Sequence, residues 1–401
     1  MTGHHARRRA ALQTTFFLVV ATMLPACASG IAAVDTGPPL TDAELAMGWG
    51  RGSNQSSGDF SEQVVLRANL GDGGSVYAKL IVSNIANSDG RAQFYFQVKT
   101  EDAQRIEFKL RADRGDWTFA TDRFRVELDG VVVEFGVGRA SVTVKTDELN
   151  ASFTITSDLM PLRPDGGRYD NGGLFYVTTI PVPRGQAELV MDVLDSELWD
   201  LSGDDDVPVE APEDGRIELS GPGYVEHRWG NIPPYELAHA SHNLLVIGDD
   251  ETVVVSAMVR PISGLEVKGP ASNAAPATGE ILGWCFAAND DELMLYAPKL
   301  DVRPYRWTTD DMTSYRIPGL VYLSDPQQLV FKGVLDLGAL SSRKDDLGGL
   351  SKLERIIVRR FMQPWTFRYE KARFLLRHQP SGRQGTEVRG EGTYMYQQIR
   401  K

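Results

Sequence analysis

Residues Gly223 to Gly230, GYVEHRWG, hold the densest group of side chains that could do chemistry. Tyr224, Glu226, His227 and Trp229 supply a phenol, an acid, an imidazole and an indole within six positions. Such groups could exchange protons with a substrate, or place a hydrogen bond on a mostly apolar ligand. These four residues are the predicted ligand-binding residues, and no residue is assigned a catalytic role.

The spacing of these residues limits what they can do together. In an extended strand alternate side chains share a face, which puts Val225, His227 and Trp229 on one side and Tyr224, Glu226 and Arg228 on the other. Glu226 and His227 therefore cannot both line one cavity unless a bulge intervenes, whereas Glu226 and Arg228 can form an ion pair. A structural interpretation stays open, with His227 hydrogen-bonded at a domain junction and Trp229 filling a core.

Other candidate sites have weaker patterns. His239 and His242 fall on opposite faces of a predicted strand and turn and have no evident third ligand for a metal. The acidic run at residues 204–206 lacks the spaced ligands of a calcium loop and is typical of a solvated loop. The sequence has no G-x-S-x-G motif, P-loop or dinucleotide-binding glycine pattern in a strand-to-helix context. We therefore predict no metal and no cofactor.

The elements that position these residues are short runs with period-two alternation, separated by Gly, Asp, Asn and Pro, which indicates antiparallel strands. The clearest runs are 76–82, 91–99, 105–110, 124–128, 141–145 and 152–156. Asp129-Gly130 between FRVEL and VVVEF predicts a two-residue hairpin. The only candidate for a long amphipathic helix is 350–361. About eight runs lie on each side of an acidic, Pro-rich break near residues 195–216, which favours an all-β fold of two barrels.

The first residues resemble an export signal followed by a lipid anchor. Arg7, Arg8 and Arg9 precede an uncharged run, and Leu24-Pro25-Ala26-Cys27 resembles the lipobox of bacterial lipoproteins. Residues 1–26 are therefore the predicted signal peptide, and 27–58 the tether behind an acylated Cys27. The expected location is the cell envelope, on the periplasmic side of an outer membrane where one exists. Cys285 then has no partner for a disulfide and is expected to be a small buried side chain.

Length and charge restrict the class of protein further. Some 370 mature residues exceed the usual size of one core, so residues 59–215 and 216–401 are predicted to form two domains. Without the three signal arginines, 39 basic residues stand against 54 acidic ones. This acidic balance argues against a nucleic-acid partner. The sequence does not indicate an oligomeric state.

The segment 223–230 also resembles the H-x-W-G signature of the two-domain lipocalin-like superfamily that holds carotenoid 1,2-hydratases, AttH-type proteins and Svf-type survival factors. SVYAKLIVSN at 75–84 is similar to the survival-factor branch, and FRYEKAR at 367–373 and GEGTY at 390–394 resemble the closing strands. The resemblance implies two tandem lipocalin-like β-barrels. It also implies a Tyr and an acid on the strand after the motif, but TVVVSAMVRP at 252–261 has neither.

Three functions follow from these observations. The favoured one is an envelope lipoprotein that binds or carries an apolar molecule, lipid-like or isoprenoid-like. The alternatives are a hydratase, isomerase or cyclase acting on an isoprenoid-like substrate, and a structural envelope protein without a ligand. A hydratase needs a carboxylic acid kept neutral in an apolar pocket, and Glu226 is the only acid in the motif.

Cys27→Ser tests the anchor. The variant lacks the thiol that would carry the acyl chains, so we expect it in the soluble envelope fraction or as an uncleaved precursor. Fractionation with N-terminal sequencing measures both. A cleaved protein that stays on the membrane would contradict lipidation.

Overall fold

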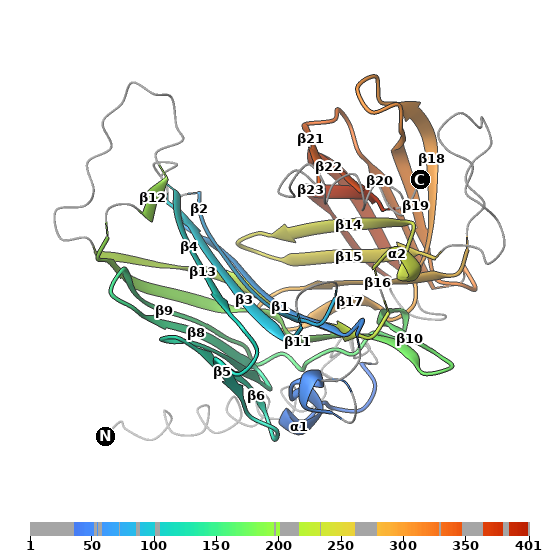
Figure 1. The fold of residues 1–401 in the computed structure, drawn as a ribbon. Helices are drawn as coiled ribbons and strands as arrows, with labels where there is room; N and C mark the ends of the chain where they lie inside the picture. Colours follow the sequence, from blue (N-terminus) through green and yellow to red (C-terminus); the bar gives the residue numbers. More distant parts are fainter. Residues whose placement is uncertain are drawn as a thin grey trace, which may run out of the picture. The chain divides into compact units, whose positions relative to one another are not determined.

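The computed structural model describes residues 36–51, 54, 58–71, 73–85, 89–100, 105–195, 198–200, 216–232, 234–260, 279–328, 330–346, 364–379 and 385–399. Within them the chain is almost entirely antiparallel strand, in two sheets (Figure 1). This confirms the predicted all-β fold with two lipocalin-like barrels. No helix among the described residues is long and apolar enough to span a membrane.

The first sheet has 13 strands. They are β1 (Ser61–Leu70), β2 (Gly74–Ser83), β3 (Arg91–Lys99), β4 (Arg105–Ala112), β5 (Trp117–Phe119), β6 (Phe124–Leu128), β7 (Val131–Gly136), β8 (Arg139–Lys145), β9 (Leu149–Thr156), β10 (Arg168–Asn171), β11 (Leu174–Val193), β12 (Trp199–Asp200) and β13 (Arg216–Gly230). Their order is β12-β4-β3-β2-β1-β13-β11-β9-β8-β7-β6-β5, and β10 pairs with β11. The 3-10 turn η3 (Asp165–Gly167) precedes β10.

The second sheet has 10 strands. They are β14 (Ala240–Ile247), β15 (Thr252–Val259), β16 (Ile281–Ala288), β17 (Leu293–Ala297), β18 (Asp301–Thr309), β19 (Arg316–Ser324), β20 (Phe331–Asp336), β21 (Ser342–Asp345), β22 (Trp365–His378) and β23 (Thr386–Gln398). Their order is β17-β16-β15-β14-β23-β22-β20-β19-β18, and β21 pairs with β22. The short helix α2 (Pro234–Leu237) links the two sheets.

The alternation seen in the sequence is the alternation of burial in the strands. In β3 every second residue is buried, and its bounds are those predicted. The hairpin between β6 and β7 has positive φ at both central residues, 33° at Asp129 and 77° at Gly130. A Cβ at Gly130 would lie 2.3 Å from the carbonyl oxygen of Lys145, so glycine is required there.

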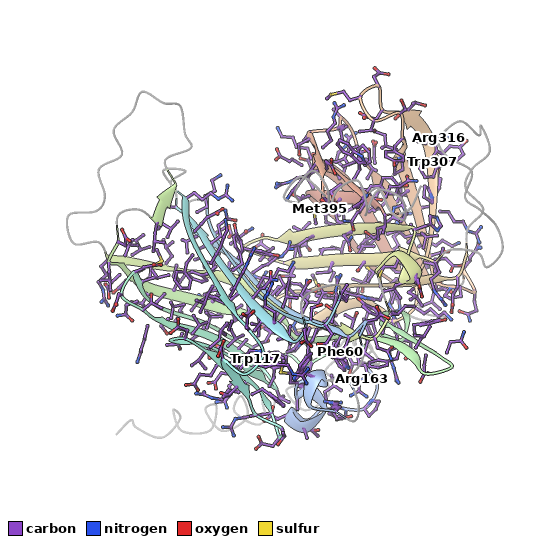
Figure 2. All side chains as sticks on the ribbon, in the orientation of Figure 1. Phe60, Trp117, Arg163, Trp307, Arg316 and Met395 are labelled. Carbon is purple, nitrogen blue, oxygen red and sulfur yellow. The ribbon has the colours of Figure 1, made fainter. Side chains whose placement is uncertain are left out.

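A short N-terminal segment packs on the first sheet through α1 (Asp42–Leu45) and the 3-10 turn η1 (Gly48–Gly50). Thr41 and Glu44 form a reciprocal capping box at the start of α1. The Trp49 ring packs against Phe60 and Trp117, at centroid distances of 5.7 and 5.6 Å. Figure 2 labels Phe60 and Trp117 in this region, beside the α1 segment.

Strand β13 belongs to the first sheet, where it pairs with β1 and β11. Residues 216–230 are thus hydrogen-bonded to strands of residues 59–215, although the sequence analysis placed them after the boundary. The boundary itself stays a prediction. Cys27, the acidic run 204–206 and the candidate helix 350–361 lie outside the described residues.

Arg184 of β11 joins the two sheets. Its Nε donates to Asp290 at 2.7 Å, and Nη1 and Nη2 donate to the carbonyl oxygens of Gly248 and Asp249 at 2.7 and 2.5 Å. Nη1 also lies 3.3 Å from the Thr252 hydroxyl. Because the side chain is only 2% exposed, the guanidinium depends on these acceptors in place of water.

An apolar cluster continues the junction, with residues from both sheets packed together. Its buried members are Leu162, Ile180, Tyr224, Ile247, Val254, Trp284, Phe286, Ala288 and Tyr296. The backbones also meet directly, because Gly166 donates its N–H to Pro298 at 2.7 Å. The two sheets therefore share one continuous interface.

We expect Arg184→Lys to lower the free energy of unfolding by about 2 to 4 kcal/mol, because an ammonium cannot replace the buried guanidinium fork at its three acceptors. Arg377→Lys is the matched control, since the pair of Arg377 with Glu387 is largely exposed; its cost should stay below about 1 kcal/mol. Denaturant unfolding measures both. Equal losses of unfolding free energy in the two variants would contradict the role assigned to Arg184.

Candidate functional site

Strand β13 divides the predicted site residues between two faces. Val225, His227 and Trp229 lie in the buried core of the first sheet. Tyr224 belongs to the cluster between the sheets, and Glu226 bonds to Arg228 on that same face. This is the predicted alternation, and it also confirms the predicted ion pair. The structure therefore does not bring Glu226 and His227 into one cavity.

His227 pairs with an acid that the sequence analysis did not single out. Its Nε2 lies 2.7 Å from Oε1 of Glu62, and both side chains are almost fully buried. The same carboxylate accepts hydrogen bonds from the backbone N–H groups of Gly48 and Trp49, each at 2.8 Å. Glu62 is on β1 and is paired in register with Trp229, two residues along β13 from His227. Only the tertiary fold therefore reveals the pair of Glu62 and His227.

Aromatic rings enclose the imidazole. Phe124 and Phe135 approach it edge-on, each with a centroid distance of 5.1 Å, and Trp229 stacks on it at 4.4 Å. A Cβ at Gly48 would lie 2.5 Å from the Trp229 ring, so glycine lets η1 pack on the indole. His227 and Glu62 thus fix η1 to the first sheet. Ligand binding by the motif residues stays a prediction.

A cavity of about 300 Å³ lies between the two sheets, partly open to solvent. Its volume is at the lower end of the range for small-molecule sites. Both sheets and the link between them contribute its lining: Ser61, Gln63, Ile85, Tyr176, Arg228, Trp229, Gly230, Ile232, Leu237, Ala238, Ser241, Asn243, Met258, Gln397 and Ile399. Trp229 and Arg228 come from the predicted motif, whereas His227 does not line this cavity.

Polar groups are concentrated on the first-sheet wall of the cavity. Arg228 donates through Nε to Glu226 at 2.6 Å, and Tyr176 accepts from the hydroxyl of Thr178 at 3.1 Å. Burial alone would lower the pKa of Arg228, but the Glu226 carboxylate raises that pKa above its ordinary value. For the phenol of Tyr176, burial raises the pKa. The wall therefore presents a cation and a protonated phenol at neutral pH.

The second-sheet wall carries neutral polar groups. Ser256 donates to Asn243 Oδ1 at 3.0 Å, and the amide of Asn243 lies 3.3 Å from the Ser241 hydroxyl. Ser241, Asn243 and Met258 line the cavity from β14 and β15. This wall supplies hydrogen-bonding groups and apolar surface but no carboxylate. Sequence reasoning missed these residues, since short strands with alternating Ser and Asn carry no motif.

His239, just before β14, and His242, on β14, belong to no metal-binding group among the described residues. The described residues contain no group of three or more His, Cys, Asp or Glu side chains placed to hold a metal ion. His242 is buried, with Nδ1 2.5 Å from the Tyr394 hydroxyl. Burial, together with His239, lowers the pKa of His242 to about 3. Cys285 is buried, as predicted, and burial raises the pKa of its thiol.

Comparisons with known proteins give structural likenesses at low identity. No family model matches the chain, and no curated protein matches it. Similar solved structures include CghA, with 11% identity, a TM-score of 0.49 and coverage of 92% of this chain and 96% of that one. An AttH-type protein of Nitrosomonas europaea has 11% identity, a TM-score of 0.48 and coverage of 91% and 99%. Kievitone hydratase from Nectria haematococca has 11% identity, a TM-score of 0.46 and coverage of 91% and 94%.

Proposed function

We propose that this protein binds a mostly apolar small molecule in the cavity between its two sheets. The main observation in support of this proposal is the set of residues that line the cavity. Ile85, Ile232, Leu237, Met258 and Ile399 supply apolar surface, and polar side chains from both sheets lie among them. Small-molecule sites combine apolar surface with polar groups held in fixed positions.

The construction of the walls supports this proposal. Tyr176 is held by Thr178, and Arg228 by Glu226, so both polar groups are oriented before a ligand arrives. Preorganised donors lose less entropy on binding than mobile ones. Arg184 ties the opposite wall in place through the β14–β15 turn. The cavity is therefore bounded by fixed elements of both sheets.

We propose that binding takes place in the cell envelope, with acyl chains on Cys27 holding the protein to a membrane. This part of the proposal depends on the lipobox-like residues before Cys27. An envelope location suits a carrier of lipid-like or isoprenoid-like molecules. A structural role without a ligand is the remaining alternative.

Turnover of the bound molecule is a second candidate, as hydration, isomerisation or cyclisation of an isoprenoid-like substrate. The observation that favours it is the Tyr176 hydroxyl, a protonated donor at the cavity wall. Against it, Glu226 is engaged by Arg228, and Met258 is the only residue of β15 that lines the cavity. Among the described residues that line the cavity there is thus no acid to protonate an alkene, and we rank binding first.

Met258→Trp tests the binding proposal. Met258 is half-buried, so an indole can extend into the cavity, and we expect at least a tenfold loss of affinity for the neutral fluorescent probe N-phenyl-1-naphthylamine. Met312→Trp is the matched control, since Met312 is 77% exposed on the second sheet. Fluorescence titration measures both. Equal affinities for the two variants and the parent chain would contradict binding in this cavity.

Tyr176→Phe separates binding from turnover. Mass spectrometry first identifies molecules extracted from the purified protein, and the chain is then incubated with them. For a carrier we expect unchanged masses with parent and variant alike. A new product that forms with the parent chain and is lost in Tyr176→Phe would establish turnover and displace the carrier proposal.

A further inference from the structure

Three cations share the face of the first sheet that borders the cavity. Arg67 of β1, Lys79 of β2 and Arg228 of β13 all point to the side opposite the barrel core. The strand register shows this directly. Val65 pairs with both Lys79 and Glu226, so the side chains of Val65, Lys79 and Glu226 lie on one face of the sheet. Arg67 is two residues after Val65 on β1, and Arg228 is two residues after Glu226 on β13, so both share that face. We call Arg67, Lys79 and Arg228 the cationic face.

Lys79 is the unusual member of the cationic face. It is half-buried, and its ammonium makes no ion pair or hydrogen bond with any side chain that the structure describes. Burial lowers the pKa of Lys79, and the positive charges of Arg67, Arg228 and Lys344 lower it further. Three other cations therefore lie close enough to Lys79 to repel its charge. Lys344 lies on β21, so one of these charges comes from the second sheet.

The nearby carboxylate of Glu226 neutralises only one member of the cationic face, Arg228. Glu226 is bonded to Arg228 by two contacts, from Nε at 2.6 Å and from Nη2 at 2.5 Å. Arg67 instead stacks on Tyr77, with the guanidinium carbon 5.0 Å from the ring centroid. This leaves Lys79 and the donor edge of Arg67 without an anionic partner among the described residues. Half-buried cations without a counter-charge are costly unless an anion completes them.

The cationic face adjoins the cavity. Gln63 and Arg228 line the cavity and are paired in register, and Gln63 pairs with Ile81 on the other side. Lys79 is two residues from Ile81 on the same face of β2. Strand spacing and rise put the Cα atom of Lys79 about 8 Å from that of Gln63. A ligand that fills the cavity can therefore place one end over Lys79.

We propose that the ligand is an anionic amphiphile, with its carboxylate or phosphate oxygens on the cationic face and its apolar part in the cavity. This inference rests on the proposed function and adds the chemical class of the ligand. Lys79 and Arg67 supply charge-assisted donors, which bind anionic oxygens more strongly than neutral donors do. Arg228 stays paired with Glu226, so the net positive charge of the cationic face comes from Lys79 and Arg67.

Three probes with one tail and different headgroups test this inference: laurate, lauryl phosphate and lauryl alcohol. Each competes with N-phenyl-1-naphthylamine for the purified full chain. We expect laurate, lauryl phosphate or both to bind at least tenfold more tightly than the alcohol. The better anion identifies the headgroup. Raised salt should reduce this preference, because screening weakens partly exposed charge contacts.

Lys79→Met supplies the variant. It keeps the length and apolar stem of the side chain and removes a poorly solvated charge, so thermal stability should be unchanged or raised. We expect the preference for the anionic probe to fall about tenfold, with lauryl alcohol binding unchanged. Lys145→Met is the control, since Lys145 is exposed at the end of β8; it should keep the preference.

The outcomes are distinct for the two proposals. Equal affinity for alcohol and anions overturns the anionic ligand, and a preference that survives in Lys79→Met overturns the placement of its headgroup on Lys79. Both outcomes leave binding in the cavity intact. Failure of all three probes and of N-phenyl-1-naphthylamine overturns the proposed function, and the anionic ligand with it.

Discussion

The alternation of β13 is the constraint on which the rest of the structure depends. One strand serves two environments, because its even and odd residues face opposite sides. Its inward residues, Val225, His227 and Trp229, complete the core of the first sheet and hold the N-terminal segment through Glu62. Its outward residues meet the second sheet and the cavity. A shift of register by one residue would exchange these sets and place the Glu226–Arg228 pair in the core.

The features that sequence predicts well are local ones. Period-two alternation gave β3 and β6 with their bounds, and Asp129-Gly130 gave the hairpin, since these depend on neighbouring residues alone. The Glu226–Arg228 ion pair could be predicted for the same reason. The contact of Glu62 with His227 could not be predicted, because the two residues are 165 positions apart and meet only through the pairing of β1 with β13. The cavity wall of Tyr176, Asn243 and Met258 likewise combines strands from separate parts of the chain.

The junction between the sheets determines the cavity as much as its lining does. Its two walls belong to different sheets, so any sliding between them would change its size. Arg184 and the apolar cluster around Tyr224 and Phe286 oppose such sliding, as does the close packing of Gly166 on Gly283. A Cβ at Gly166 would lie 1.8 Å from the Gly283 carbonyl oxygen, so this backbone contact tolerates only glycine. The proposed binding in the cavity therefore depends on the stability of the junction.

The acidic composition of the chain does not conflict with an anionic ligand. The formal net charge of −12 acts over long distances and argues against a polyanionic partner that spans much of the surface. At physiological ionic strength the screening length is about 8 Å, so distant carboxylates hardly affect a small ligand in contact with Lys79. Desolvation strengthens the contact further, because charges near the cavity interact in a medium less polar than water. For the proposed anionic ligand, the local arrangement of cations therefore matters more than the charge of the whole chain.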